Sequence, residues 1–209
     1  NGTTQTVTNA GGFQPDFIWT KNRSIAQNHY SADTNQGISW VLRENSDATR
    51  SQDTNFFTSV TSSGFTLGTS NFGNGENIVA WQWQAGLGTI TTNTSGNVTS
   101  NVCVSTTAGF SICTFTTQSL GSSGTIGHGL GKKPDLIVYK HYNEVAGWIV
   151  YHSSIGATKY LAWNDTMAAT ANNNVWANTE PTSSVFTLGT SPSGSKPTVA
   201  YCWTSIPGF

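Results

Sequence analysis

The chain has 209 residues, a formal net charge of −1 and only 9% charged residues, where soluble proteins average about 25%. Without an excess of basic residues there is no positive field to hold a phosphate backbone, so nucleic acid is disfavoured as a partner. No apolar run approaches the ~18 residues of a membrane-spanning helix, so membrane insertion is not expected.

The composition favours strands over helices. Aromatic residues make up 11% of the chain, with eight Trp and a single Met, and the scarce charged residues are replaced by Thr, Ser, Asn and Gly. Thr and aromatic residues suit pleated strands, whereas Asn, Ser and Gly suit tight turns. The composition therefore predicts an all-β protein.

The first part of the chain reads as short strands separated by turn signals. Pro15 precedes an apolar run, as expected at the start of a strand, where the missing N–H does least harm. The segment 43–54 predicts a long loop with, at most, a short helical turn. Apolar strand patterns occur, in order, at residues 3–8, 16–21, 29–33, 38–42, 56–57, 64–68 and 78–83.

A stretch rich in Gly, Thr, Asn and Ser at residues 86–101 predicts a domain boundary. We place the first domain at residues 1–87 and the second at 88–209. The second domain opens with predicted strands that have no counterpart in the first, so the first is expected to take its opening strand from an upstream segment or a neighbouring subunit. Predicted strands or apolar restarts follow at 102–104, 109–116, 134–140, 148–152, 159–163, 175–176, 184–189 and 198–203.

The motif Phe-Thr-Leu-Gly-Thr-Ser occurs twice, and Phe65 and Phe186 are 186 − 65 = 121 positions apart. Pro15 and Pro134 keep nearly the same offset, 134 − 15 = 119. A period near 120 residues is the size of a small domain and exceeds the roughly 20–50 residues of solenoid and propeller repeats. We therefore expect two tandem β-sandwich domains, jelly-roll or lectin-like, related by internal duplication. A closed barrel is the alternative. The chain looks like a window from a longer tandem array.

The sequence contains few patterns of reactive residues. A nucleophile elbow, a zinc-protease motif, a phosphate loop and a Cys-x-x-Cys pair are all missing, and no acidic cluster supplies the 6–8 oxygen ligands of calcium. The four His are scattered and are expected to be single surface imidazoles. Cys103, Cys113 and Cys202 are expected to be buried thiols, although Cys103 and Cys113 can also bridge neighbouring strands. We expect no catalytic residue, no metal and no cofactor.

Five residues are candidates for ligand binding. Asp33 and His152 occupy equivalent positions just before a turn (152 − 33 = 119), and their different chemistry favours a structural role such as satisfying turn amides. Trp163-Asn164-Asp165 combines an aromatic ring, which stacks on sugar C–H groups, with an amide and a carboxylate that bond hydroxyl groups. The same trio also suits an exposed loop beside a core Trp. The repeated aromatic residues Trp81, Tyr201 and Trp203 are expected to be core.

Several stretches resemble a module repeated in virion and tail-fibre proteins of marine bacteriophages. They are residues 12–24, 53–68 and 76–83 in the first part, and 127–131, 134–138, 148–152, 157–161 and 182–186 in the second. The resemblance implies a non-enzymatic virion component, structural or host-recognising. It also implies other virion subunits as partners, a homo-oligomer and contact with a host surface polysaccharide. It carries no catalytic or binding residues to this chain. The alternatives are a carbohydrate-binding module or adhesin of a cell-surface protein and, less directly, a depolymerase fragment.

Overall fold

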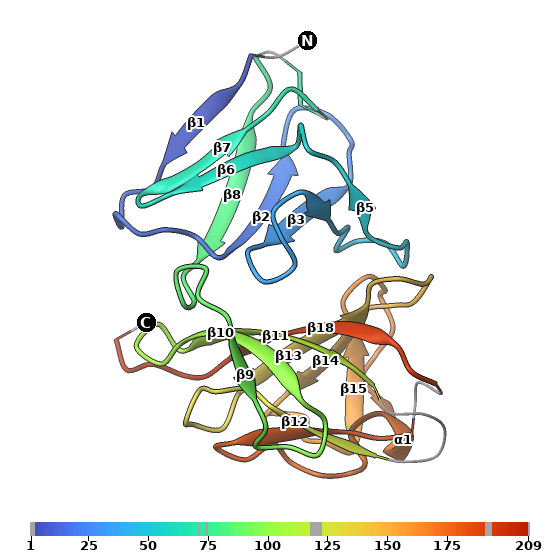
Figure 1. Ribbon diagram of the computed structural model, residues 1–209. Coiled ribbons are helices and arrows are strands. Elements are labelled where there is room, and N and C mark those ends of the chain that lie inside the picture. The colour runs from blue at the N-terminus through green and yellow to red at the C-terminus, as the bar shows by residue number, and fades with distance from the viewer. Residues whose placement is uncertain (1–2, 71, 74, 118–122, 191–193, 209) are drawn as a thin grey trace.

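The computed structural model describes residues 3–70, 72–73, 75–117, 123–190 and 194–208. Ser191, the last residue of the repeated motif, lies outside the described residues. Within them the protein is almost entirely β, and every pairing between named strands is antiparallel. Figure 1 shows two halves, one above the other: the first half holds β1 to β8 and the second holds β9 to β18.

Two three-stranded sheets build the first half. One has the order β1 (Gln5–Thr8), β7 (Gly64–Leu67), β6 (Phe57–Thr61), and the other has the order β3 (His29–Asp33), β2 (Phe17–Asn22), β8 (Ile78–Trp83). A small ladder joins β4 (Trp40–Val41) to β5 (Ser51–Gln52). The buried core of this half includes Ile18 and Tyr30 from one sheet and Phe57, Phe65 and Leu67 from the other.

An eight-stranded sheet dominates the second half. Its order is β16 (Thr170–Ala171), β15 (Lys159–Ala162), β14 (Ile149–His152), β13 (Leu136–His141), β18 (Pro197–Trp203), β11 (Phe110–Thr116), β10 (Ser100–Ser105) and β9 (Thr91–Asn93). The pair β12 (Gly124–Gly127) and β17 (Val185–Leu188) forms a second sheet, and α1 (Asn173–Trp176) is a single helical turn. The core of this half includes Ile137, Tyr151, Trp176 and Phe186.

The two halves share one order of pairings. In the first, β2 pairs with the next strand β3 and with the last strand β8; in the second, β13 pairs in the same way with β14 and β18. The ladder β1–β7 has its counterpart in β12–β17. The predicted turn glycines Gly37 and Gly156 both have positive φ, 93° and 70°. Strands β10 and β11 have no equivalent among the described strands of the first half.

The glycine of the repeated motif is required by a close backbone approach. A Cβ on Gly68 would lie 2.1 Å from the Asn55 carbonyl oxygen, and one on Gly189 would lie 2.3 Å from that of Asn174. The N–H of each glycine donates to a nearby carbonyl, at 2.8 Å for Gly68 and 2.7 Å for Gly189. Any side chain at these positions must push the neighbouring segment away.

Some predicted features differ from the structure. Strand β9 lies inside the predicted linker, because a solvated strand of Thr and Asn carries no apolar alternation. Val175 and Trp176, where the sequence shows only that the apolar pattern restarts, lie in the short helical turn α1, and the Asn172 side chain caps this turn by accepting the N–H of Asn174. Asn is a favoured N-cap residue, which explains the local preference.

Two histidines are buried, contrary to the prediction of surface imidazoles. His128 is fully buried, with Nε2 3.2 Å from the Thr182 carbonyl oxygen. His141 is 5% exposed, with Nδ1 2.7 Å from the Thr198 hydroxyl. Hydrogen bonds to partners distant in sequence offset the cost of burying each ring. The three cysteines, in contrast, are buried free thiols as predicted.

A third core joins the two halves. The sheet β3-β2-β8 and the eight-stranded sheet meet at the boundary, and both have apolar side chains on both faces. Buried side chains therefore also fill the space between the two halves. Each half therefore shares a core with the other in addition to having its own. The shared core includes Phe17, Leu42 and Ala85 from the first half and Phe110, Val138, Trp148 and Tyr201 from the second.

Candidate functional site

Strand alternation places the repeated aromatic residues at the boundary between the halves. Successive side chains on a strand point to opposite faces, so Ile18 enters the core of the first half while Phe17 and Trp19 face the second half. Tyr201 is buried there and Trp203 is half-buried, in line with the predicted burial. Trp81 was also predicted to be core, but it is 41% exposed, and the strand that carries it, β8, pairs only with β2 among the described strands.

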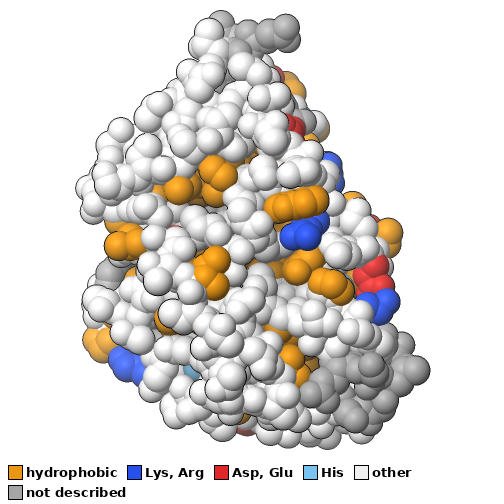
Figure 2. Space-filling view, in the orientation of Figure 1, with side chains coloured by type: hydrophobic (Ala, Val, Ile, Leu, Met, Phe, Trp, Pro, Cys, Tyr) orange, Lys and Arg blue, Asp and Glu red, His pale blue; other side chains and the backbone are white. Residues whose placement is uncertain are grey.

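These rings enclose a cavity of about 320 Å³, which we call the inter-half cavity. Figure 2 shows hydrophobic side chains gathered along the same boundary on the molecular surface. Glu44 is the one charged residue among the described residues that line the cavity. The lining residues are Phe17, Trp19, Glu44 and Trp83 from the first half, and Leu136, Val138, Trp148, Trp163, Tyr201 and Trp203 from the second.

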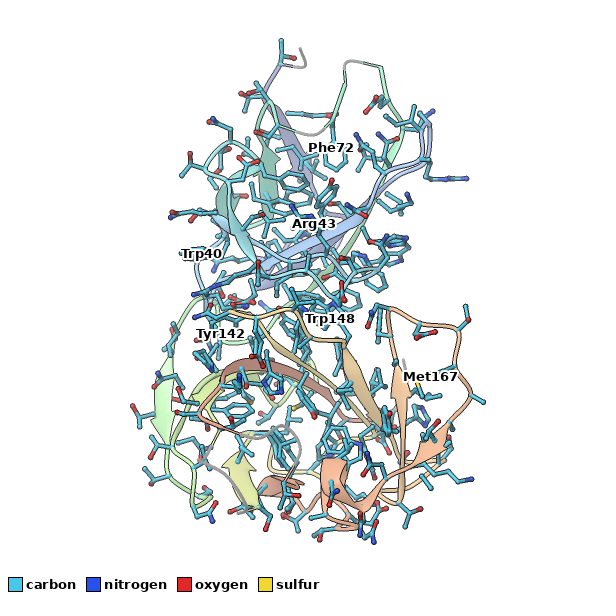
Figure 3. The ribbon with its side chains drawn as sticks, turned by 90° about the vertical axis from the view of Figure 1, so that its right-hand side faces the viewer. Trp40, Arg43, Phe72, Tyr142, Trp148 and Met167 are labelled. Carbon is cyan, nitrogen blue, oxygen red and sulfur yellow. The ribbon has the colours of Figure 1, made fainter. Side chains whose placement is uncertain are left out.

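Aromatic and polar contacts hold the boundary together beside the cavity. The Arg50 guanidinium carbon lies 4.1 Å from the ring centre of Trp40 and 4.0 Å from that of Tyr142. The Trp148 indole N–H donates to the Arg43 carbonyl oxygen at 2.8 Å. Figure 3 shows Trp40 and Arg43 on one side of the boundary and Tyr142 and Trp148 on the other. Arg50 is half-buried, so these cation–π contacts add to the packing between the halves without dominating it.

Asp33 and Tyr201 form a buried hydrogen bond between the halves. The Tyr201 hydroxyl donates to Asp33 Oδ2 at 2.7 Å. Asp33 also accepts the backbone N–H of Gln36 at 2.7 Å, the turn-amide role expected from the sequence. Burial raises the pKa of Asp33, although the hydrogen bonds oppose this, and burial raises the pKa of Tyr201 well above its usual value.

Glu44 and Lys140 are two further buried charges at the boundary. Burial raises the pKa of Glu44 to about 8, and burial lowers the pKa of Lys140 to about 8. The Lys140 ammonium donates to the carbonyl oxygens of Asp47 at 3.1 Å and Ala146 at 2.5 Å. Both Glu44 carboxylate oxygens are buried, and neither has a hydrogen-bond partner in the described part of the chain. The Ser31 hydroxyl lies near enough to favour the ionised form but makes no bond of ordinary geometry.

A second, shallower depression, which we call the outer hollow, lies next to the cavity and measures about 390 Å³. It brings together three of the five residues singled out from the sequence, His152, Trp163 and Asp165, with Met167 on the same rim. Trp163 and Leu136 line both the outer hollow and the inter-half cavity.

The remaining predicted residues have structural roles or lie apart. Asn164 Oδ1 accepts the backbone N–H of Trp148 at 2.8 Å and so positions the start of β14. Within the outer hollow, Asp165 accepts the Thr166 N–H at 2.6 Å, and His152 Nδ1 accepts the Ser154 N–H at 3.1 Å, again satisfying a turn amide. Asp33 is buried at the boundary and lines neither space.

The sequence analysis did not predict that Glu44, Trp19 and Trp148 line a cavity. The repeat offset could have drawn attention to Glu44. Glu44 and Trp163 are 163 − 44 = 119 positions apart and therefore occupy equivalent places. A carboxylate stands in the first half where the second half has an indole, and both line the inter-half cavity.

The described residues contain no group of three or more His, Cys, Asp or Glu side chains placed to hold a metal ion. Among the same residues, no helix reaches the length and apolarity needed to cross a bilayer. Several carboxylates stabilise the fold by accepting hydrogen bonds from backbone amides. Asp16, for example, accepts the amides of Ala85, Leu87 and Gly88 at 2.6–3.0 Å, and so fixes the segment that leaves β8.

The layered antiparallel sheets and the aromatic boundary define an all-β domain with a ligand-sized cavity between its halves. The chain belongs to the family described as a domain of unknown function (DUF7483), whose model matches residues 1–209. No curated protein and no solved structure matches the chain.

Proposed function

We propose that this domain is a non-enzymatic structural module of a virion appendage such as a bacteriophage tail fibre, linked to neighbouring repeats by strand addition at β8. The resemblance described for the sequence supports the virion setting. The single observation that carries the structural role is the edge of the sheet β3-β2-β8. Strand β18, the counterpart of β8, is flanked by β13 and β11, whereas β8 is flanked only by β2 among the described strands.

The outer edge of β8 has the properties of an acceptor for another strand. Its sequence, Ile78 to Trp83, contains no charged residue and no proline, the two devices that usually protect an edge from pairing. A groove of about 640 Å³ lies at its end, lined by residues of both halves, including Gln82, Trp83, Phe13 and Ile206. We propose that a strand with the pattern of β11, donated by another repeat, occupies this edge.

The shared order of pairings supports an origin of the two halves by internal duplication of a β-sandwich. Under this proposal the first half takes from a neighbour the opening strands that β10 and β11 supply to the second half. Tandem repeats joined in this way form a stiff rod, and a symmetric homo-oligomer multiplies weak contacts with a host surface.

A chimera tests the strand addition. Residues 88–121 are placed ahead of Thr3, which reproduces the spacing between β11 and β12. We expect the grafted segment to pair with β8 and to slow amide hydrogen exchange along β8 by at least about tenfold. The matched control carries Ile112→Pro in the grafted copy only, because proline breaks the ladder. Equal exchange in chimera and control would refute the acceptor edge.

Detection of the chain in purified particles tests the virion assignment independently. An antibody against this domain should recognise material that sediments with intact virions. A chain found only in a cell-surface fraction would favour the alternative below.

A carbohydrate-binding module or adhesin is the second candidate, favoured by the outer hollow. There the half-buried Trp163 ring offers a stacking surface beside the exposed Asp165 carboxylate. Titration with bacterial surface polysaccharides should give a saturable change in Trp fluorescence that Trp163→Ala abolishes and that Asp165→Asn weakens. A response that survives Trp163→Ala would rule out this hollow as the sugar site. Release of reducing ends, lost in Asp165→Asn, would instead indicate a depolymerase.

A further inference from the structure

We propose that the inter-half cavity binds the hydrocarbon chain of a neutral amphiphile, whose hydroxyl-bearing head group lies in the outer hollow. The proposal depends neither on the virion setting nor on strand addition at β8. It differs from the sugar-site candidate because the chain, and not the head group, provides most of the affinity. At about 320 Å³, the cavity is at the small end of the ~300–1,000 Å³ typical of ligand sites.

The wall of the cavity presents almost no charge to a ligand. Glu44 is the one charged residue among the described lining residues, but it is 3% exposed and both of its carboxylate oxygens are covered by protein. Lys140, the nearby buried cation, is fully covered and donates to two carbonyl oxygens. An uncharged, apolar occupant is the one that such a wall favours.

The polar atoms of three lining side chains are turned away to protein partners. The indole N–H of Trp19 donates to His29 Nδ1 at 3.1 Å. The indole N–H of Trp148 donates to a carbonyl oxygen, and the Tyr201 hydroxyl donates to a carboxylate. Hydroxyl or ammonium groups placed inside the cavity would lose their bonds to water and gain few in return. The polar part of the ligand therefore has to stay outside.

The size of the cavity also favours an occupant. Protein interiors leave few voids larger than a water molecule, and about 320 Å³ is far larger than that. Atoms that line an empty apolar space lose contacts on one side, and a hydrocarbon restores them. A dry apolar cavity of about 150 Å³ is enough to bind benzene, so the inter-half cavity has room for a longer hydrocarbon.

The rings of the lining meet at steep angles. The ring planes of Trp83 and Trp203 cross at 72°, and those of Trp19 and Trp163 cross at 56°. Phe17 lies at 69° to Trp203. Crossed faces of this kind do not form a flat slot for a planar ring system, whereas a hydrocarbon chain can bend to follow them.

The outer hollow provides a place for the head group. Leu136 and Trp163 line both the hollow and the cavity, so the two spaces adjoin. Both residues are half-buried, whereas His152 and Asp165 in the hollow are exposed. The carboxylate of Asp165 can accept hydrogen bonds from hydroxyl groups. A ligand with its chain in the cavity thus keeps its head group in contact with water.

The test is a titration of the whole chain with hexyl, octyl and decyl β-D-glucoside, each below its critical micelle concentration. Binding is followed by Trp fluorescence and by calorimetry at several temperatures. We expect saturable binding with a negative heat-capacity change. The affinity should rise about fourfold for each added methylene until the chain fills the cavity, and then stop rising. Glucose alone should bind at least about tenfold more weakly than octyl glucoside.

Two substitutions that add bulk locate the site. Val138 is 3% exposed and lines the cavity, so Val138→Phe takes up part of the space and should weaken octyl glucoside at least about tenfold. Val145→Phe makes the same change at a position that is 72% exposed and outside the lining, and it should bind as the unaltered chain does. Leu136→Trp narrows the junction with the outer hollow and should also weaken binding.

Four results would each overturn the proposal. No saturable binding of any alkyl glucoside would exclude the site. Glucose that binds as tightly as octyl glucoside would favour a plain sugar site in the outer hollow. Tighter binding of 2-naphthyl β-D-glucoside than of octyl glucoside would indicate a planar ligand. Unchanged affinity in a Val138→Phe chain that circular dichroism shows to be folded would place the chain elsewhere.

The second variant covers a failure of the first to fold. If Val138→Phe does not fold, unchanged octyl glucoside affinity in Leu136→Trp would also overturn the proposal. None of these outcomes bears on the strand-addition test at β8.

Discussion

The hydroxyl of Tyr201 and the carboxylate of Asp33 meet at 2.7 Å in the middle of the molecule, although 168 positions separate them in the chain. Both residues are 1% exposed. They belong to different halves, so this bond forms only when the halves close on each other.

Tyr201→Phe therefore removes a hydrogen-bond donor and leaves a buried carboxyl with fewer partners. We expect the free energy of unfolding to fall by about 1–3 kcal/mol, measured by urea denaturation. Tyr160→Phe serves as the control, because Tyr160 packs against the core of the second half and not against the core that the two halves share. Equal effects of the two substitutions would contradict a special role for the Tyr201–Asp33 bond.

The pH dependence of stability should reveal Glu44. Its folded pKa of about 8 exceeds the ordinary value of 4.5, so the folded state holds a proton that the unfolded state releases across this interval. This contribution to stability is fully present below pH 4.5 and is lost as pH rises toward 8, with a slope of at most ~1.4 kcal/mol per pH unit.

A comparison of the unaltered chain with Glu44→Gln isolates this effect. Burial also lowers the pKa of His141 to about 4, so His141 adds stability as pH rises from 4 to 6.5, but it does so in both proteins. We expect Glu44→Gln to gain stability relative to the unaltered chain between pH 5 and pH 8, as measured by thermal unfolding. A constant difference over that range would show that Glu44 titrates normally.

Substitution of the motif glycines should be costly in both halves. Gly68→Ala and Gly189→Ala each place a methyl group within 2.1 Å and 2.3 Å of a backbone oxygen, and we expect a loss of about 1–3 kcal/mol for each. Gly147→Ala is the control, since its nearest neighbour would lie at 3.4 Å and its φ is not positive. Denaturation curves of all three variants decide the point, and a motif variant as stable as Gly147→Ala would disprove the close approach.

The three cysteines should be unreactive in the native chain. Each is 0% exposed and free, and burial raises the pKa of Cys103 and of Cys202, which disfavours the reactive thiolate. We expect no rapid reaction with an aromatic disulfide reagent in buffer and modification of all three thiols in urea. Fewer than three reactive thiols in urea without reductant would indicate a disulfide.

The all-β class, most strand positions and the near-120-residue period are properties of the sequence itself. The alternation of apolar and polar residues, the turn glycines and the Phe-Thr-Leu-Gly motif each span only a few residues. They can therefore be recognised without knowing the fold. The close approach at Gly68 and Gly189 explains why both copies of the motif have glycine at this position. The turn-amide roles of Asp33 and His152 also follow from local geometry.

The tertiary structure decided what covers each face. Alternation shows that Phe17 and Trp19 share a face, but only the closing of the two halves places them against Val138 and Tyr201. The same closing buries Glu44 within electrostatic reach of Lys140, a residue of the other half. His128 and His141 are buried by contacts more than 50 positions away, and β8 pairs only with β2 among the described strands. A sequence can show that both faces of a sheet are apolar and therefore buried. It does not show which segment covers each face, because that depends on contacts between residues far apart in the chain.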